Sequence, residues 1–175
     1  MTPAPATAVP TAPRLSTARG GKYLTFALGK EEYGLEILKV REIIGYMEIT
    51  SVPSMPAHVK GVINLRGQVI SVVDLRTRFG MAATERSEQN CIIVVEVAAN
   101  SRKFHCGVIV DRVSEVLNIA EDLIEDPPSL GASVNTDFIV GMGKVGDAVK
   151  ILLNLDRVLA EHLPESAAQP AAASN

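Results

Sequence analysis

The chain has 175 residues, of which 47% are apolar and 21% charged, and its formal net charge is −3. This composition predicts one soluble globular domain with a sizeable core, and the acidic balance argues against a nucleic-acid-binding protein, which would carry a basic surface. The two cysteines, Cys91 and Cys106, lie in apolar runs without a second ligand at metal spacing, so we expect two buried thiols. No apolar run is long enough to span a membrane, and we expect no direct membrane insertion.

The two ends of the chain are rich in Pro and Ala and lack the apolar segments that could build a core. We therefore expect disordered tails at residues 1–21 and 164–175, and no secretory signal at the N-terminus. The folded domain is predicted to cover residues 22–163.

The first part of the folded region alternates apolar and polar residues in three short runs, which is the pattern of half-buried strands. In the third run, Val40, Glu42 and Ile44 share one side. A loop with two prolines follows, and Pro56–Lys60 is predicted to form one helical turn. The predicted strands are Lys22–Leu28, Tyr33–Ile37 and Lys39–Ile44.

The stretch GVINLRGQVISVVDLRTRFG, residues 61–80, predicts a hairpin followed by a short helix. Two runs of β-branched residues flank Arg66-Gly67, and Gly67 supplies the backbone angles of a tight reversal. Asp74 is predicted to cap the helix, which Gly80 ends. A guanidinium at the tip of such a hairpin can bind a carboxylate or carbonyl of a partner, although residue chemistry alone favours an ordinary solvated turn residue.

The second part of the chain starts with the nearly continuous apolar run CIIVVEV, which predicts a central strand. Ala120–Glu125 is predicted to contain a helical turn, and Pro127–Thr136 a loop. The remaining predicted elements are the strands Cys91–Val97, Phe104–Val110, Asp111–Ile119, Asp137–Lys144 and Ala148–Asn154, and the helix Leu155–Leu163.

An internal repeat relates the two parts. GLEILKVREII aligns with GVIVDRVSEVL, so that Glu42 corresponds to Glu115, and VVDLRTRF aligns with LLNLDRVL, so that Asp74 corresponds to Asn154. The repeat predicts a mainly β protein of two five-stranded barrels, which close with few free edges and share an apolar seam. We expect the first barrel at about residues 22–89, the second at about 90–155, a C-terminal helix at 155–163, and a binding groove at the rim of the seam.

The sequence contains no catalytic motif. The three histidines are scattered, and the glycine-rich run Gly141–Gly146 lacks the lysine ending of a phosphate loop and leads into a strand. We therefore expect no catalytic residue, no cofactor and no metal. An enzyme that uses this run to hold a nucleotide is the alternative. On residue chemistry alone, Glu42 also fits a solvated strand face, and Val40, Ile92 and Val116 also fit a core.

Three segments resemble the CheW family of chemotaxis coupling proteins: EEYGLEILKVREI, VKGVINLRGQVISVVDLRTRFG and CGVIVDRVSEVL. The resemblance implies two SH3-like β-barrels and a non-catalytic adaptor of signal transduction. Such an adaptor couples the cytoplasmic tips of chemoreceptors (methyl-accepting chemotaxis proteins) to the regulatory domain of the histidine kinase CheA. It further implies a cytoplasmic protein that is recruited to receptor arrays at the inner membrane face. The same fold could serve a receptor–kinase pathway other than chemotaxis.

The resemblance also implies a receptor-binding surface. Arg66 resembles the arginine with which the family contacts receptors, and Asn64 and Gly67 complete its turn. Val40 and Glu42 lie in the strand that borders the same groove. Three further positions, Ile92, Gly107 and Val116, match positions associated with coupling in the second half of the family. Because receptor tips are helical hairpins, we expect a helix to bind in the groove.

Overall fold

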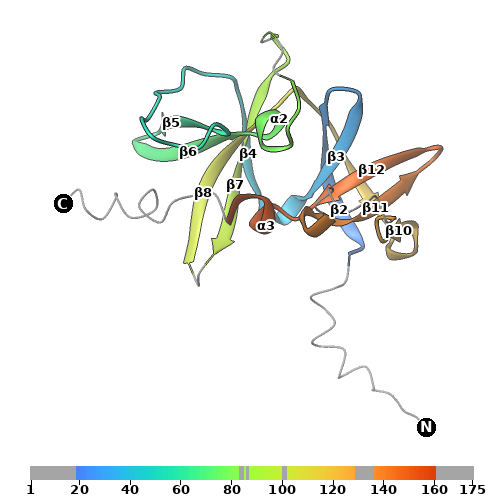
Figure 1. The fold of residues 1–175 in the computed structure, drawn as a ribbon. Helices are drawn as coiled ribbons and strands as arrows, with labels where there is room; N and C mark the ends of the chain where they lie inside the picture. The colour runs from blue at the N-terminus through green and yellow to red at the C-terminus, as the bar shows by residue number, and fades with distance from the viewer. Residues whose placement is uncertain (1–18, 83–84, 86, 100–101, 129–135, 161–175) are drawn as a thin grey trace.

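The computed structural model describes residues 19–82, 85, 87–99, 102–128 and 136–160, so most of both expected tails lies outside the described residues. The fold is mainly β, as predicted, and the described strands form two sheets (Figure 1). Within the described residues, no helix has both the length and the apolar character that a bilayer crossing needs.

We call the six-stranded sheet "sheet I" and the five-stranded sheet "sheet II". Across sheet I the strands are β10 (Ile124–Glu125), β11 (Ile139–Val145), β12 (Ala148–Leu153), β3 (Glu31–Glu36), β2 (Gly21–Leu28) and β9 (Arg112–Ile119). Across sheet II they are β4 (Val40–Gly45), β7 (Cys91–Ala99), β8 (Arg102–Val110), β6 (Gln68–Asp74) and β5 (Val59–Leu65). Among the described residues the helices are α2 (Leu75–Arg78) and α3 (Leu155–Ala160), with 3₁₀ turns η1 (Ile37–Lys39), η2 (Glu121–Leu123) and η3 (Thr136–Phe138).

Each sheet contains strands from both halves of the repeat. In sheet I, β3 of the first half lies parallel to β12 of the second, and in sheet II, β8 of the second half lies parallel to β6 of the first. The predicted barrel boundaries, residues 22–89 and 90–155, therefore coincide with neither sheet. Apolar periodicity predicts that a segment is a strand, but it does not determine which strand becomes its neighbour.

The two parallel contacts are equivalent under the repeat, because Gly34 faces Leu152 in one and Gly107 faces Val72 in the other. Both glycines are buried, and both allow a close approach. A Cβ atom on Gly34 would lie 2.8 Å from Cδ2 of Leu152, and one on Gly107 would lie 2.8 Å from Cγ2 of Ile92. A side chain at either position would therefore overpack these neighbouring side chains.

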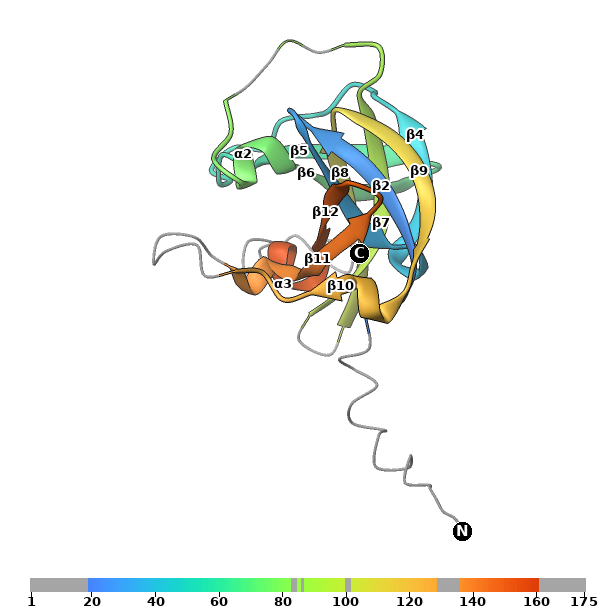
Figure 2. The ribbon, with the colours of Figure 1, turned by 90° about the vertical axis from the view of Figure 1, so that its right-hand side faces the viewer.

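Both sheets bring their first and last strands together. After β4, the chain returns so that Thr50 bridges Val62 of β5, and this closes sheet II. After β9, the chain passes through η2 into β10, which pairs with β11 and closes sheet I (Figure 2). Gly61 lies at the closure of sheet II, where a Cβ atom would overlap the carbonyl oxygen of Thr50.

The largest apolar cluster lies between the two sheets, where the sequence predicts a shared seam. Phe26 and Leu28 from sheet I, Val95 and Val108 from sheet II, and Val158 of α3 are all completely buried there. Two smaller clusters fill the individual sheets, one around Ile63, Ile70, Val72, Ile92 and Val94, the other around Tyr23, Ile119, Ile124 and Leu152. Burial of apolar area therefore holds the two sheets together.

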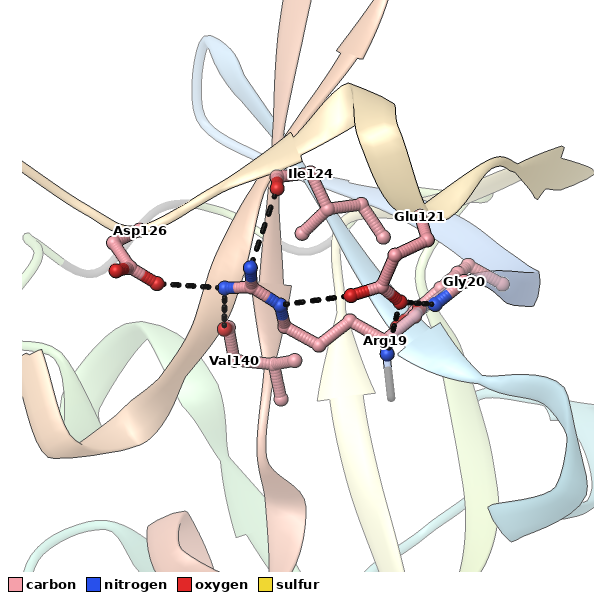
Figure 3. A network of polar contacts seen from close by, with 7 residues as sticks. Arg19, Gly20, Glu121, Ile124, Asp126 and Val140 are labelled. Atoms are coloured by element: carbon pink, nitrogen blue, oxygen red, sulfur yellow. Dashed lines mark hydrogen bonds and ion pairs between the residues drawn. The ribbon is translucent and has the colours of Figure 1, made fainter. Parts of the chain in front are cut away.

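Three local expectations differ from the structure. The predicted helical turn at Pro56–Lys60 is absent, since β5 begins at Val59, and the second predicted strand ends at Glu36, where η1 carries the chain into sheet II. The folded region also begins before Lys22. Figure 3 shows Arg19 held by Glu121, Asp126 and the carbonyl oxygens of Ile124 and Val140, at the strand that closes sheet I.

Candidate functional site

Arg66 lies at the tip of the predicted hairpin. Leu65 and Gln68 pair across a two-residue loop, and both loop residues have positive φ, 51° at Arg66 and 88° at Gly67. This is the combination of a type I′ turn, whose twist matches that of the flanking strands. The side-chain oxygen of Asn64 accepts a hydrogen bond of 2.8 Å from the backbone N–H of Gly67 and ties the turn from inside. The tip is therefore a rigid platform for the Arg66 side chain.

The guanidinium of Arg66 forms an ion pair with the carboxylate of Glu42 on β4. The Arg66 side chain remains 68% exposed and that of Glu42 30% exposed. Because β4 and β5 are the first and last strands of sheet II, this ion pair joins the two ends of the sheet. One carboxylate does not use all five N–H donors of a guanidinium, so Arg66 can still bind an acceptor on a partner.

Two of the predicted site residues lie beneath this surface. Ile92 is 0% exposed in the interior of sheet II, and Gly107 is buried beside it. Neither has a surface that a partner could touch. Their location indicates that they support the strands under the hairpin.

The last two predicted residues lie on edge strands. Val40 is half-buried on β4, two residues before Glu42, and its side chain packs against the cluster between the sheets. Val116 lies on β9 of sheet I, in register with Leu24, and is 50% exposed. The structure thus brings Glu42, Asn64, Arg66 and Gly67 together in sheet II, while Val116 lies on the other sheet. The expectation that Val40, Glu42 and Ile44 share one side is wrong, because a bulge between Val40 and Glu42 turns the Val40 side chain to the opposite face, toward the cluster between the sheets.

The corresponding hairpin of the second half lacks the cation. In the alignment that matches Asp74 with Asn154, Arg66 corresponds to Gly146, which has a φ of 61° in the loop between Val145 and Ala148. The two hairpins thus share their strand pairing but differ in the side chain at the tip. The second hairpin therefore cannot make the contact that the Arg66 side chain allows at the first.

Sequence reasoning missed several charged contacts. Arg41 on β4 pairs with Glu96 on β7, and hydrogen bonding from Arg41 lowers the pKa of Glu96. Arg76 of α2 pairs with Asp111, and Lys39 pairs with Asp156 of α3. The last two pairs have one feature that is visible in the sequence. Arg76 and Asp156 are equivalent under the repeat and carry opposite charges. Ile43, 43% exposed on β4, was also missed.

A surface hollow lies at the end of β4, away from Arg66. It is lined by Gly45, Tyr46, Met47, Glu48, Ser87, Glu88 and Asn90. None of the predicted site residues lines it.

Comparison with known proteins gives a consistent result. A model of the CheW-like domain matches residues 22–162. The chain is 36% identical over 140 residues to a chemotaxis protein CheW of Klebsiella aerogenes, covering 80% of this chain and 82% of that protein. It is 34% identical over 151 residues to a chemotaxis protein CheW of Rhizobium meliloti, covering 86% and 95%. The crystal structure of the scaffolding protein TtCheW from Thermoanaerobacter tengcongensis superposes with a TM-score of 0.70 at 38% identity, covering 80% of this chain and 92% of that one.

Proposed function

This chain belongs to the CheW family, and from that premise we propose that it is an adaptor of bacterial chemotaxis signalling that couples chemoreceptors to the histidine kinase CheA. The observation that carries the proposal is the exposed Arg66, which a rigid turn and Glu42 orient at one end of the molecule. Family membership alone supports the general role, whereas this side chain supports a particular contact.

The receptor surface comprises Val40, Glu42, Asn64, Arg66, Gly67 and Val116, with Ile92 and Gly107 beneath it. Receptor tips are helical hairpins, and a helix that binds in a groove needs apolar contacts beside its polar ones. Ile43 and Val116, 43% and 50% exposed, supply apolar area on the edge strands of the two sheets. Arg66 then provides a charge-assisted hydrogen bond to an acceptor on the helix.

The adaptor acts without catalysis, at the cytoplasmic face of the inner membrane, where receptor tips lie. The absence of a catalytic motif in the sequence supports the first statement, and membership of a family with scaffolding members supports both. The purified protein should acquire no stable phosphate when it is mixed with CheA and ATP. Phosphate that remains on this chain would contradict a purely adaptor role.

The substitution Arg66→Glu tests the receptor contact. Reversal removes the guanidinium and adds repulsion, and a hot-spot residue of an interface contributes about 2 kcal/mol or more, which is roughly thirtyfold in affinity. We expect binding to receptor-containing membranes to fall by about this factor, with CheA binding less affected. The measurements are a thermal melt and separate binding titrations with receptor and kinase.

Two further variants complete the experiment. Lys30→Glu makes the same charge change at the exposed turn between β2 and β3 and should leave receptor binding unchanged. Arg66→Asn removes the charge but keeps a residue that tolerates positive φ. Its receptor affinity should therefore fall, while its melting temperature should equal that of wild type. Wild-type receptor affinity in both Arg66 variants would show that Arg66 is an ordinary turn residue.

A further inference from the structure

Two ion pairs connect the sheets at the points where the chain crosses from one sheet to the other. The first joins Arg76 of α2 to Asp111, which links β8 of sheet II to β9 of sheet I. Nε and Nη2 of Arg76 donate to the two carboxylate oxygens of Asp111 at 2.9 and 2.7 Å. One of these oxygens also accepts a bond of 2.7 Å from the backbone N–H of Gly29, in the turn between β2 and β3. The side chains of Arg76 and Asp111 are only 15% and 27% exposed.

The second ion pair joins Asp156 of α3 to Lys39, at the crossing from β3 of sheet I to β4 of sheet II. The Lys39 ammonium lies 2.8 Å from one oxygen of Asp156, and the backbone N–H of Ala98 on β7 donates to the other at 2.9 Å. The two side chains are 29% and 32% exposed. In both junctions a carboxylate thus binds one cation and one backbone N–H.

The two helix residues of the junctions are equivalent under the repeat but carry opposite charges, and their partners occupy adjacent repeat positions, since Lys39 aligns with Arg112 and Asp111 with Leu38. In the alignment that matches Asp74 with Asn154, Arg76 corresponds to Asp156, and each is the second residue of its helix. In the first junction the helix carries the cation, and in the second it carries the anion.

Each junction also lies directly before a strand of the receptor surface. Lys39 immediately precedes β4, which carries Val40 and Glu42, and Asp111 immediately precedes β9, which carries Val116. α2 in turn directly follows β6, the strand that starts at the Arg66 turn. The junctions therefore lie next to β4 and β9. These two strands belong to different sheets, but both carry residues of the proposed receptor surface.

We infer that Lys39, Asp156, Arg76 and Asp111 are positioning residues, and that the two junctions fix β4 and β9 relative to each other so that one receptor helix can contact both. The inference rests on the proposed function for the identity of the partner. The placement of β4 and β9 itself can be measured in the protein without any partner.

The first experiment uses the free protein. Amide chemical shifts of Glu42 and Val116 are compared between wild type, Lys39→Gln and Arg76→Gln. Lys144→Gln is the matched control, because it breaks a 2.7 Å lysine–carboxylate pair with Glu125 that lies within sheet I. We expect Lys39→Gln to shift Glu42, Arg76→Gln to shift Val116, and the control to shift neither. Unchanged shifts at both residues would overturn the inference.

The second experiment measures binding of a helical-hairpin fragment of a receptor tip, at a temperature where the melts show every variant folded. Lys39→Gln and Arg76→Gln should each weaken fragment binding about tenfold and CheA binding less than threefold. The conservative variant Lys39→Arg, which keeps a cation beside Asp156, should bind the fragment nearly as well as wild type does. Equal losses for fragment and kinase, or a loss in Lys39→Arg as large as that in Lys39→Gln, would refute positioning.

The two experiments separate the two proposals. If the wild-type protein does not bind the fragment, the proposed function fails, while the shifts of the free protein still decide the inference. If wild type binds, Arg66→Glu does not, and both glutamine variants bind like wild type, the function stands and the inference fails.

Discussion

Arg66 has a backbone conformation that residues other than Gly, Asn and Asp seldom adopt. The left-handed region costs such a residue roughly 1–2 kcal/mol, and an exposed ion pair with Glu42 returns at most about 1 kcal/mol. An asparagine would fit this turn without the penalty. The arginine therefore does not contribute to folding stability at this position. Its strained backbone and exposed charge favour a role in an interaction.

Gly107 allows a specific stability prediction. The substitution Gly107→Ala places a Cβ atom 2.8 Å from Cγ2 of Ile92 in the middle of sheet II, and the branched Ile92 side chain has little rotamer freedom to move away. We expect a loss of about 1–3 kcal/mol in the free energy of unfolding, the usual cost of overpacking. Denaturant titration measures it. Gly45→Ala is the control, since no atom lies within 4 Å of its Cβ position, and its effect should stay within about 0.5 kcal/mol.

This substitution also tests the role of Gly107 in coupling. If Gly107 acts only as a support, receptor binding by the folded fraction of Gly107→Ala should remain within a few-fold of wild type. A large loss of binding without a loss of stability would show that a partner reaches this position directly.

Asp111 makes stability depend on pH. Hydrogen bonds from Arg76, followed by the bond from Gly29, hold the pKa of Asp111 below its ordinary value. A lowered pKa means that the ionised group stabilises the fold above the unfolded pKa of about 3.9, and that this contribution disappears as pH falls through the folded value. Asp111→Asn should therefore be less stable than wild type at pH 7 by about 1–3 kcal/mol.

The difference between wild type and Asp111→Asn should shrink as the pH falls below about 4, since both side chains are then neutral. Chemical denaturation at several pH values measures it. A difference that stays constant down to pH 2 would mean that packing, and not the charge of Asp111, is responsible.

At the scale of single elements, the N-terminal segment has a structural role that composition did not predict. The backbone N–H groups of Arg19 and Gly20 donate to Glu121 at 2.7 and 2.8 Å, and the Arg19 guanidinium lies 2.8 Å from Asp126. Burial raises the pKa of Tyr23 to about 12, so its hydroxyl remains a donor to the carbonyl of Arg19. These contacts hold η2 and β10 against β11 (Figure 3).

Two truncations test this role. A chain that starts at Arg19 should unfold at the same temperature as the full chain, whereas a chain that starts at Lys22 should unfold at a lower temperature, because Glu121 and Asp126 lose their partner. Thermal melts of the two chains measure the difference. Equal melting temperatures would show that the Arg19 contacts contribute nothing to stability.

The sequence allowed prediction of turns and helix caps, but not of which strands pair with each other. The Arg66-Gly67 turn and the Asp74 cap depend on residues close in sequence, and the structure contains both, with Asp74 accepting a bond of 3.0 Å from the N–H of Arg76. The pairing of β3 with β12 joins segments from opposite ends of the folded region. The apolar pattern of β3 predicts a strand, but it does not determine which other strand becomes its neighbour. Arg19 was missed because a composition average over a Pro- and Ala-rich window hides a single arginine.

At the scale of the whole molecule, the mixed sheets predict one cooperative unfolding transition. Neither half contains a complete sheet, and the largest apolar cluster lies between the sheets. We expect coincident thermal transitions by near- and far-ultraviolet circular dichroism, as a two-state protein shows. Two separate transitions, or a fragment of residues 91–160 that folds alone as a monomer, would contradict this reading.

The exchange of strands between halves also has a consequence for how such a chain can arise. A homodimer of a single half, with β3 of each copy placed beside the last strand of the other, would make the Gly34–Leu152 contact twice by two-fold symmetry, and exchange of elements is a low-cost route to such dimers. Fusion of the two copies through the segment after α2 reproduces the present topology without moving a strand. The ancestor would have had two identical tips. A fused chain can keep an arginine at residue 66 and a glycine at residue 146, and so offer two different surfaces from one duplicated gene.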